Sequence, residues 1–187
     1  MGGAGERKQR TRRQILESAW RRFSASGFEA TSIEEIMADC ALTHGGFYAH
    51  FRSKSELYRE AIGAALANDW LWASMPGLGR DAIDDALRSP QLGFLAADVA
   101  SADPAVREGC TRALREVSRR ILGGGASESA MLSLTAVIVG ALAVGRSSED
   151  RVFRARLASA CEEVARLLAG ERAEGAPAYF WEPQPTT

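Results

Sequence analysis

The sequence predicts an all-α protein, and three observations carry that prediction. Apolar residues recur at three- and four-residue steps through most of the 187 residues, which is the spacing of one helix face. Helix starts are marked by Ser or Thr with Glu three residues later, and by Asp103 directly before Pro104. No segment alternates apolar and polar residues as a half-buried strand does.

The N-terminal segment is basic and leads into the first predicted helix, residues 10–26. Residues 1–22 hold seven bases and two acids, a local net charge of +5 in a chain whose net charge is −1. A basic arm on a near-neutral protein is typical of phosphate binding at one end of the molecule, and a solvated disordered leader is the alternative. Gly27 follows the helix at the position where a helix end favours glycine.

A second helix is predicted over residues 33–39, followed by a tight turn. Thr31 and Ser32 each have Glu three residues later, so either residue has the spacing of a capping box. An apolar stripe with the period of a core-facing helix runs along the residues that follow. Cys40-Ala41-Leu42 then predicts the turn, with Leu42 at the junction.

The stretch 43–51 predicts a very short third helix. Phe47 and Phe51 lie four residues apart on its buried face, whereas the other face is polar or small. Ser53 and Glu56 have capping-box spacing and start a fourth helix at once. A helix, a tight turn and a second helix with an exposed start form a helix-turn-helix, whose second helix enters the major groove of DNA.

Residues from about 11 to 57 resemble the DNA-binding domain of the TetR family of transcriptional regulators. The resemblance covers about a quarter of the chain and rests on three spaced groups of residues: Ile15-Leu16-x-x-Ala19, Phe23-x-x-x-Gly27-Phe28-x-x-Thr31-Ser32-Ile33-x-x-Ile36, and Gly45-Gly46-Phe47-Tyr48-x-His50-Phe51-x-Ser53-Lys54-x-x-Leu57. The family commonly has Gly in the turn where this chain has Ala41, so we expect strain or a changed turn there. Within the family, the Gly-Gly-Phe-Tyr-x-His-Phe wording and residues 92–107 look most like multidrug- and flavonoid-responsive regulators.

Three regions are expected along the chain. They are a basic arm with the helix-turn-helix DNA-binding domain over 1–57, a helical ligand-binding and dimerisation domain over 58–170, and a tail over 171–187. The fourth helix is predicted as one rod from residue 53 to about 74, which would touch both domains. Further helices are predicted over 81–88, 92–100, about 103–122, 127–147 and 149–169.

The helix at 127–147 is apolar on all sides, and such a helix must be covered all round. A partner subunit is the expected cover, since a domain of this size has few elements to spare; burial inside a monomer is the alternative. Together with the last helix it predicts a four-helix bundle across a twofold axis. The family resemblance likewise implies a homodimer through the last two long helices.

Candidate DNA-binding residues follow from the geometry of a helix-turn-helix. Thr43 is expected to cap the short helix and bond a phosphate, His44 and Gly45 to meet bases, and Gly46 to let the backbone approach a thymine methyl; a plain surface histidine is the alternative for His44. The remaining phosphate contacts are expected from the helix start at Ser32 and from Arg12, Tyr48, His50 and Lys54.

A ligand pocket is expected in the second domain, as the resemblance implies. The residues that supply more soft apolar surface than a small core needs are Trp70, Trp72, Met75, Phe94, Leu95, Cys110, Leu114 and Met131. These residues offer no charged anchor, so an apolar small-molecule effector is favoured over a metal complex. For any single one of them, an ordinary place in the core is the alternative.

Other classes of function find little support. His44 and His50, the only histidines, have no Ser or Cys partner for a triad, so we expect no enzyme; Cys40 and His44 span the turn and do not predict a metal site. No cofactor is expected. Three cysteines without CxxC spacing, and no apolar leader, predict free thiols in the cytoplasm, with a redox switch at Cys110 or Cys161 left open. The longest apolar run, 16 residues at 130–145, is shorter than the about 20 that cross a bilayer, so no membrane contact is expected.

The sequence therefore predicts a dimeric repressor that binds a palindromic operator and is released by an apolar ligand. Two reading heads related by a twofold axis need half-sites about one helical turn apart, roughly 34–36 Å. A helical ligand-binding or protein-interaction module without DNA binding is the alternative. The effector, the operator sequence and the choice between repressor and activator stay open.

Overall fold

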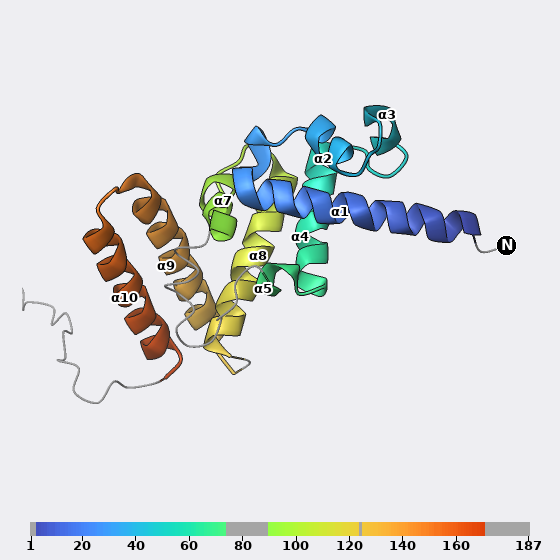
Figure 1. Cartoon of the computed structure of the whole chain (residues 1–187). Helices are drawn as coiled ribbons and strands as arrows, with labels where there is room; N and C mark the ends of the chain where they lie inside the picture. Colours follow the sequence, from blue (N-terminus) through green and yellow to red (C-terminus); the bar gives the residue numbers. More distant parts are fainter. Residues whose placement is uncertain (1–2, 74–89, 124, 171–187) are drawn as a thin grey trace, which may run out of the picture.

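The computed structural model describes residues 3–73, 90–123 and 125–170, and within these ranges the chain forms helices and loops with no strand (Figure 1). The predicted all-α class is confirmed. The helices are α1 (Gly3–Ala30), α2 (Ile33–Asp39), α3 (His44–Phe47), α4 (Lys54–Ala67), α5 (Trp70–Ala73), α7 (Pro90–Asp98), α8 (Pro104–Leu122), α9 (Glu128–Ser147) and α10 (Arg151–Leu168). The helix predicted at 81–88 and the tail at 171–187 lie outside the described residues.

Helix α1 is longer than predicted at its start, because the basic arm continues the helix back to Gly3. Lys, Arg and Gln are good helix formers, so the arm has no local reason to end the helix at residue 10. The predicted end is confirmed in substance, since Gly27 has non-helical angles (φ 82°, ψ 174°) and kinks the chain inside the assigned range. The arm end of α1 projects past the other helices in Figure 1.

The first four helices pack around a shared apolar core. Phe23, Ile36, Phe47 and Leu57 come from α1, α2, α3 and α4, and each is at most 1% exposed. Burying a side chain of this size contributes about 1.5–3 kcal/mol. Apolar burial thus holds α2 and α3, which have seven and four residues and are too short to be stable alone, against the longer α1 and α4. We refer to α1–α3 and the start of α4 as the head.

The fourth helix is not the single rod that the sequence predicted. It ends at Ala67, where Asn68 is the C-cap and Asp69 adopts the left-handed region (φ 56°). Asn and Asp tolerate that conformation better than most residues, which explains why the chain turns here. A new short helix then places Leu71 in the core at 1% exposure, between two tryptophans that the sequence analysis had favoured.

The body consists of α7–α10, with α4 packed against α8. The predicted start of α8 is confirmed, since the Asp103 carboxylate accepts a hydrogen bond from the Ala105 amide (2.8 Å) and Pro104 is the first helical residue. The predicted stripe on α8 is buried at Val106, Cys110 and Val117.

Helices α9 and α10 form a hairpin at the end of the molecule opposite α3 (Figure 1). One side of α9 is buried through Leu134 and Ile138, but Leu132 and Val144 stay 49% and 46% exposed. Within the described residues α9 alone is long and apolar enough to cross a membrane, with a mean hydropathy of 1.7 over Glu128–Gly145, although the core helix of a soluble protein passes the same test. The helix is apolar on all sides, as predicted, but the described part of the chain covers only one of its sides.

Candidate nucleic-acid interface

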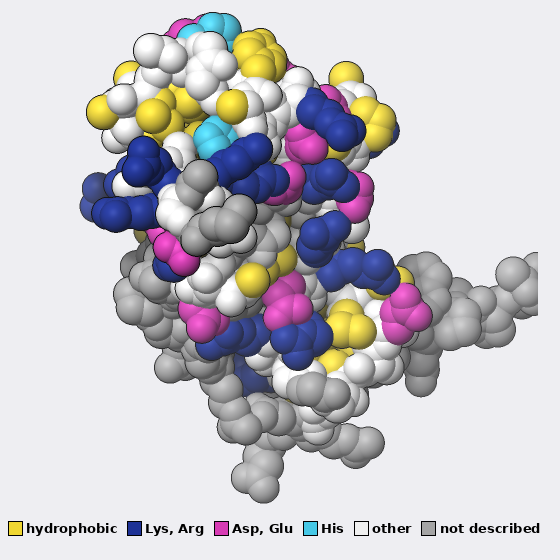
Figure 2. Space-filling view, turned by 90° about the vertical axis from the view of Figure 1, so that its right-hand side faces the viewer, with side chains coloured by type: hydrophobic (Ala, Val, Ile, Leu, Met, Phe, Trp, Pro, Cys, Tyr) yellow, Lys and Arg dark blue, Asp and Glu magenta, His cyan; other side chains and the backbone are white. Residues whose placement is uncertain are grey.

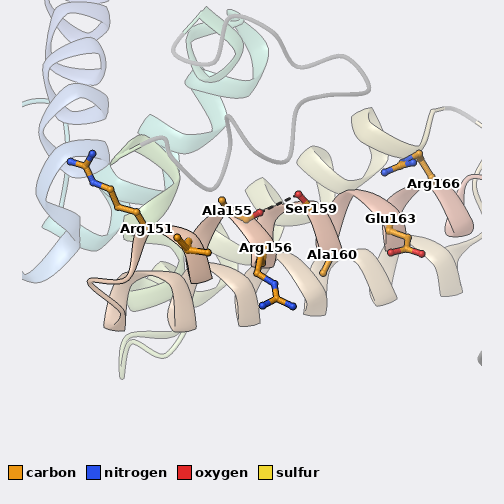
Figure 3. Close-up of a pocket in the computed structure, with 8 residues that line it drawn as sticks. Arg151, Ala155, Arg156, Ser159, Ala160, Glu163 and Arg166 are labelled. Carbon is orange, nitrogen blue, oxygen red and sulfur yellow. Dashed lines mark hydrogen bonds between the residues drawn. The ribbon is translucent and has the colours of Figure 1, made fainter.

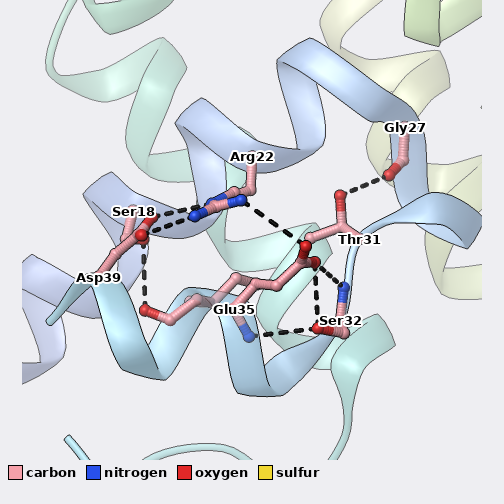
Figure 4. A network of polar contacts seen from close by, with 8 residues as sticks. Ser18, Arg22, Gly27, Thr31, Ser32, Glu35 and Asp39 are labelled. Atoms are coloured by element: carbon pink, nitrogen blue, oxygen red, sulfur yellow. Dashed lines mark hydrogen bonds and ion pairs between the residues drawn. The ribbon is translucent and has the colours of Figure 1, made fainter. Parts of the chain in front are cut away.

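Helix α2 begins with a complete capping box at Ser32. The Ser32 hydroxyl oxygen accepts from the Glu35 amide (3.2 Å), and the Glu35 carboxylate accepts from the Ser32 amide (2.9 Å). The second candidate cap, Thr31, instead donates its hydroxyl to the Gly27 carbonyl (2.8 Å), as Figure 4 shows. Ser32 is thus the cap, and Thr31 ties the start of α2 to the kink in α1.

A polar network holds the far end of α2 against α1 (Figure 4). The Arg22 guanidinium donates to both carboxylate oxygens of Asp39 (2.9 and 2.7 Å), and the Ser18 hydroxyl donates to one of them (2.9 Å). These hydrogen bonds, the one from Arg22 first, lower the pKa of Asp39 to about 2. Together with the hydrogen bond from Thr31 to Gly27, they fix both ends of α2 on α1.

The turn between α2 and α3 keeps the left-handed geometry in which the family prefers glycine. Ala41 has φ 55°, and the amides of Ala41 and Leu42 bond the carbonyls of Ala38 (3.0 Å) and Met37 (2.9 Å). Ala pays a steric penalty of about 1–2 kcal/mol in this region. The strain expected at Ala41 is therefore present, and the turn itself is retained.

Helix α3 is one turn long and is held by its buried aromatic side. Phe47 is fully buried and Phe51 is 2% exposed, with ring centroids 5.8 Å apart, as the sequence predicted. Thr43 occupies the N-cap position, but its side chain makes no capping hydrogen bond, so that part of the prediction is wrong. Its backbone carbonyl accepts from the Gly46 amide instead (2.9 Å), which leaves the exposed hydroxyl available to an outside partner.

The outer face of α3 is open. Nothing lies within 4 Å of the place where a Gly45 side chain would begin, and Tyr48 is 62% exposed. His44 is exposed as well, with its Nε2 3.6 Å from a Glu34 carboxylate oxygen and its ring 5.7 Å from that of Tyr48. Gly46 faces Met37 and Thr43 at ordinary contact distances, so it is the less open of the two glycines.

Arg12 binds within the protein rather than pointing outward. Its guanidinium donates to the His50 carbonyl (3.0 Å), pairs with Glu60, and lies 4.2 Å above the Phe51 ring centroid. These contacts join α1 to the segment after α3 and to α4. In this structure Arg12 positions the head, and a phosphate contact from it would require these bonds to be given up.

His50 and Lys54 lie beside the same face. Burial, and then the charges of Lys8 and Arg12, lower the pKa of His50, and its Nδ1 atom is buried without a hydrogen-bond partner. The Lys54 ammonium lies 4.4 Å from the Phe28 ring centroid and 3.4 Å from the Glu29 carbonyl oxygen. Figure 2 shows both histidine side chains on this end of the molecule, with Lys and Arg side chains gathered near one of them.

The residues expected to line a ligand pocket are not gathered in one hollow. Phe94, Leu95, Cys110 and Leu114 are at most 3% exposed in the core, and Trp70 is half-buried against it. Met131 lines an open groove of about 1150 Å³ between α4, α8 and α9, together with Arg107, Arg112 and Arg115. The side chain of Trp72 and the whole of Met75 lie outside what the structure describes.

The thiols have little nucleophilic character. Burial raises the pKa of Cys110 to about 12 and also raises the pKa of Cys40 and Cys161, so the thiolate fraction is small. Among the described residues no group of three or more His, Cys, Asp or Glu side chains could hold a metal ion.

Sequence reasoning missed two residues that shape this interface. Arg22 was counted only as part of the basic arm, although its i+17 partner Asp39 makes it a clamp on α2. Asp98, on α7, is 5% exposed and accepts hydrogen bonds from the Phe28 amide. No local pattern could have found either pair, because each partner lies on a different helix.

Replacing Ala41 by Gly is expected to stabilise the protein by about 0.5–1 kcal/mol, the relief of left-handed strain less the greater entropy of an unfolded glycine. Urea unfolding of Ala41→Gly and wild type measures this. A matched Ala38→Gly variant, inside α2, should destabilise by about 1 kcal/mol. Equal losses in both variants would show that the turn carries no strain.

The Asp39 hydrogen bonds make stability depend on pH in the acid range. Because the folded pKa of about 2 lies below the ordinary 3.8, the stabilisation is present above pH 4 and is lost as the pH falls toward 2. Asp39→Asn should flatten this part of the stability profile, by about 1 kcal/mol or less since the pair is exposed. Unfolding midpoints between pH 2 and 6 test it, with Asp69→Asn, at a carboxylate outside the contact between α1 and α2, as the control for the substitution itself.

Comparison with known proteins bears first on the head. Residues 15–61 match the family described as bacterial regulatory proteins, tetR family. The segment is similar to the uncharacterised HTH-type transcriptional regulator YerO of Bacillus subtilis (41% identical over 56 residues, 30% of this chain and 18% of the relative). It is also similar to the HTH-type transcriptional regulator AcrR of Shigella flexneri (44% over 52 residues, 28% and 24%). These matches span less than a third of the relatives' own lengths.

Solved structures extend the likeness to the whole fold. A TetR-family transcriptional regulator from Cytophaga hutchinsonii superposes with a TM-score of 0.60 at 17% identity, covering 87% of this chain and 96% of that one. The structure of RolR in complex with its ligand resorcinol gives 0.52 at 18% identity, with 86% and 95% covered. The local match and the shared fold agree: residues 15–61 form a tetR-type helix-turn-helix domain, and the chain has the fold of the TetR-family regulators.

Proposed function

We propose that the protein is a dimeric transcriptional repressor that binds a palindromic operator and is released by an apolar small molecule. The observation that carries the proposal is the open face of α3. Phe47 and Phe51 anchor the helix from below, while Thr43, His44 and Gly45 remain exposed and free of covering chain. A single polar turn held rigidly at its base suits the major groove.

Base reading falls to His44 and Gly45 in this proposal. An imidazole can donate or accept a hydrogen bond at a base edge, and the open space at Gly45 admits the groove wall without a clash. Gly46 contributes through close backbone approach to a thymine methyl. A Glu34 carboxylate oxygen lies 3.6 Å from His44 Nε2, close enough for an ion pair when the imidazole is protonated.

Phosphate binding surrounds this reading turn. Thr43 and Tyr48 offer exposed donors, and the half-buried His50 and Lys54 lie beside them. The first amides of α2 beyond Ser32 add an anion-attracting helix start. Four bases of the arm lie exposed on α1 and supply a second contact to the DNA backbone: Arg7, Lys8, Arg10 and Arg13. Arg12 supports this surface from within by holding the His50 carbonyl.

A second copy of the chain is the proposed cover for the α9–α10 hairpin. Val152, Phe153 and Leu167 on α10 are 68%, 41% and 55% exposed, next to the exposed apolar side of α9. Figure 3 shows the shallow hollow of about 680 Å³ along α10, where small Ala155 and Ala160 lie between charged side chains. Small residues allow close helix approach, and the mixed charges of Arg156 and Glu163 allow a twofold partner to pair with them.

The effector is proposed as an apolar, flat molecule bound in the body. Trp70 and Met131 are the predicted pocket residues that remain partly open, while Phe94, Cys110 and Leu114 would have to rearrange around a ligand. Trp72 and Met75 stay in the proposal on their residue type alone. RolR, which shares the fold, is a resorcinol complex, and this supports an aromatic ligand by analogy of fold alone. Membership of the multidrug- or flavonoid-responsive branch and a cytoplasmic location belong to the same proposal.

Operator selection tests the DNA-binding claim. Duplexes retained by the purified chain from a random pool should share inverted half-sites, and binding should weaken steeply as salt rises. His44→Ala should weaken binding about tenfold and relax the preference at one position of each half-site. Arg119→Ala, which removes an exposed charge on α8, serves as the control. Retention of no duplex would leave the ligand-binding or protein-interaction module as the better description.

Dimerisation is tested by placing a charge on the exposed hairpin. Val152→Asp should weaken self-association at least tenfold, because twofold symmetry buries two carboxylates together. Sedimentation velocity over a concentration series measures it, with Thr111→Asp, exposed on α8, as the matched control. A wild-type chain that sediments as a monomer at every concentration would contradict the proposed interface.

A further inference from the structure

A buried carboxylate on α7 reaches across to the end of α1. Asp98 is 5% exposed, and its two oxygens accept hydrogen bonds from the Phe28 amide at 3.1 and 2.9 Å. One of these oxygens also accepts from the Tyr58 hydroxyl (2.9 Å), which lies 2.9 Å from the Cys110 sulfur. One side chain of the body therefore joins α1, α4 and, through Tyr58, α8.

The chain is built to admit this carboxylate. Gly27 adopts φ 82°, and a Cβ at this position would lie 3.2 Å from the Asp98 Oδ1 atom. The kink turns the Phe28 amide out of the helical hydrogen-bond ladder, so the amide needs an acceptor from elsewhere. The glycine at the kink leaves room for the carboxylate, and the carboxylate supplies the acceptor that the kink requires.

The same short segment sets the place of α2. Thr31 donates to the Gly27 carbonyl, and the Phe28 ring packs edge-on against Tyr58 with centroids 5.4 Å apart. Ser32 follows immediately as the cap of α2. A shift of the Gly27–Phe28 junction would therefore be passed to α2, and from α2 to α3, with which it packs.

A carboxylate is a costly way to achieve simple packing. Burial raises the pKa of Asp98 and, with the Cys110 and Asp98 contacts, that of Tyr58, so the folded chain bears a desolvation penalty here. An apolar residue would avoid that penalty. The carboxylate instead makes the position of α7 on α1 strict, because displacement of α7 would leave the Asp98 charge and the Phe28 amide buried and unpaired. Helix α7 also packs against α9, which belongs to the exposed hairpin.

We propose that Asp98 is a positioning residue for the reading head, and that its bonds to Phe28 and Tyr58 transmit displacement of α7 to the DNA affinity of α3. This inference rests on the proposed DNA-binding function. Coupling between body and head requires a contact that differs between the DNA-bound and the released state, and the contact of α7 with α1 takes that role in the proposal.

Three variants of the full chain test the proposal. Asp98→Ala removes the hydrogen bonds of the Asp98 carboxylate to the Phe28 amide and the Tyr58 hydroxyl. Asp98→Asn keeps them in altered form, since its carbonyl oxygen can accept from Phe28 while its amide donates to the Tyr58 oxygen and Tyr58 donates to Cys110. Leu134→Ala, on α9 and fully buried, destabilises the body by leaving a cavity but keeps every hydrogen bond of Asp98. Each variant is compared with wild type in melting temperature, affinity for the selected operator duplex, and amide exchange.

The expected pattern separates positioning from stability. Asp98→Ala should bind the operator at least tenfold more weakly and exchange the Phe28 amide and residues 32–47 faster. Asp98→Asn should stay within about threefold of wild type. Leu134→Ala should lose at least as much melting temperature as Asp98→Ala yet keep operator affinity within about threefold. Operator affinity that follows melting temperature across all variants, or an Asp98→Ala variant that binds normally, would overturn the proposal.

Failure of Asp98→Ala to fold and failure of the wild-type protein to bind DNA each call for a further measurement. Should Asp98→Ala fail to fold, Tyr58→Phe replaces it, because it removes only the hydroxyl donor, and must speed exchange at Phe28 and weaken binding at least threefold. Should wild-type protein retain no duplex, the proposed function fails by itself. Amide exchange then tests the role of Asp98 by itself: faster exchange over residues 32–47 in Asp98→Ala but not in Leu134→Ala supports it, and equal exchange in both variants rejects it.

Discussion

Burial of Phe47 and Phe51 is the constraint on which the head depends. Helix α3 has four residues, which is far fewer than an isolated helix needs to form in water. Its shape is therefore imposed by packing. The two phenyl rings stack within the core, and Arg12 covers Phe51 while holding the His50 carbonyl behind it. The outer face can be nearly bare because none of its side chains is needed to keep the helix in place.

Charge in the head is divided between structure and exposure. Arg12 and Arg22 form ion pairs that join α1 to α4 and to α2, so part of the basic arm serves the fold. The bases toward the start of α1 stay exposed on a helix that projects beyond the core. Proximity to Lys8 and Arg12, on top of burial, depresses the pKa of His50, which favours the neutral imidazole at this border. A net charge near zero thus coexists with a strongly basic end.

The two ends of the molecule face different tasks, and α7 and α4 lie between them. Among the described residues, the exposed large aliphatic side chains and the exposed Phe153 lie on the α9–α10 hairpin, whereas the exposed face of α3 in the head is polar or small apart from Tyr48. Helix α4 packs on both α1 and α8, and α7 packs on both α1 and α9. Of the contacts between head and body, those of Asp98 have strict direction, because a buried carboxylate tolerates misplacement less than apolar surface does.

Local signals in the sequence determined the class of the fold, the capping of α2 at Ser32, the start of α8 at Asp103 and the inward face of α3. Each of these depends on residues within one turn of each other. Ala41 belongs here too, since its strain follows from the turn that its neighbours impose. The break after Ala67 was missed because Leu66 and Trp70, four residues apart, keep the helical period across Asn68 and Asp69, and only the packing of Leu71 shows where the chain turns.

What the tertiary structure alone decided are the pairings between distant segments. Asp39 with Arg22, Arg12 with His50, and Asp98 with Phe28 join residues 17, 38 and 70 positions apart. It also shows that Phe94, Cys110 and Leu114 are buried in the core, which the sequence had left open beside a place in a ligand pocket. The physical reason is the same in each case: periodicity reports which face of a helix is apolar, but not which partner that face meets. Partners are set by how helices pack, and a buried polar group shows its role only when its acceptor or donor is in view.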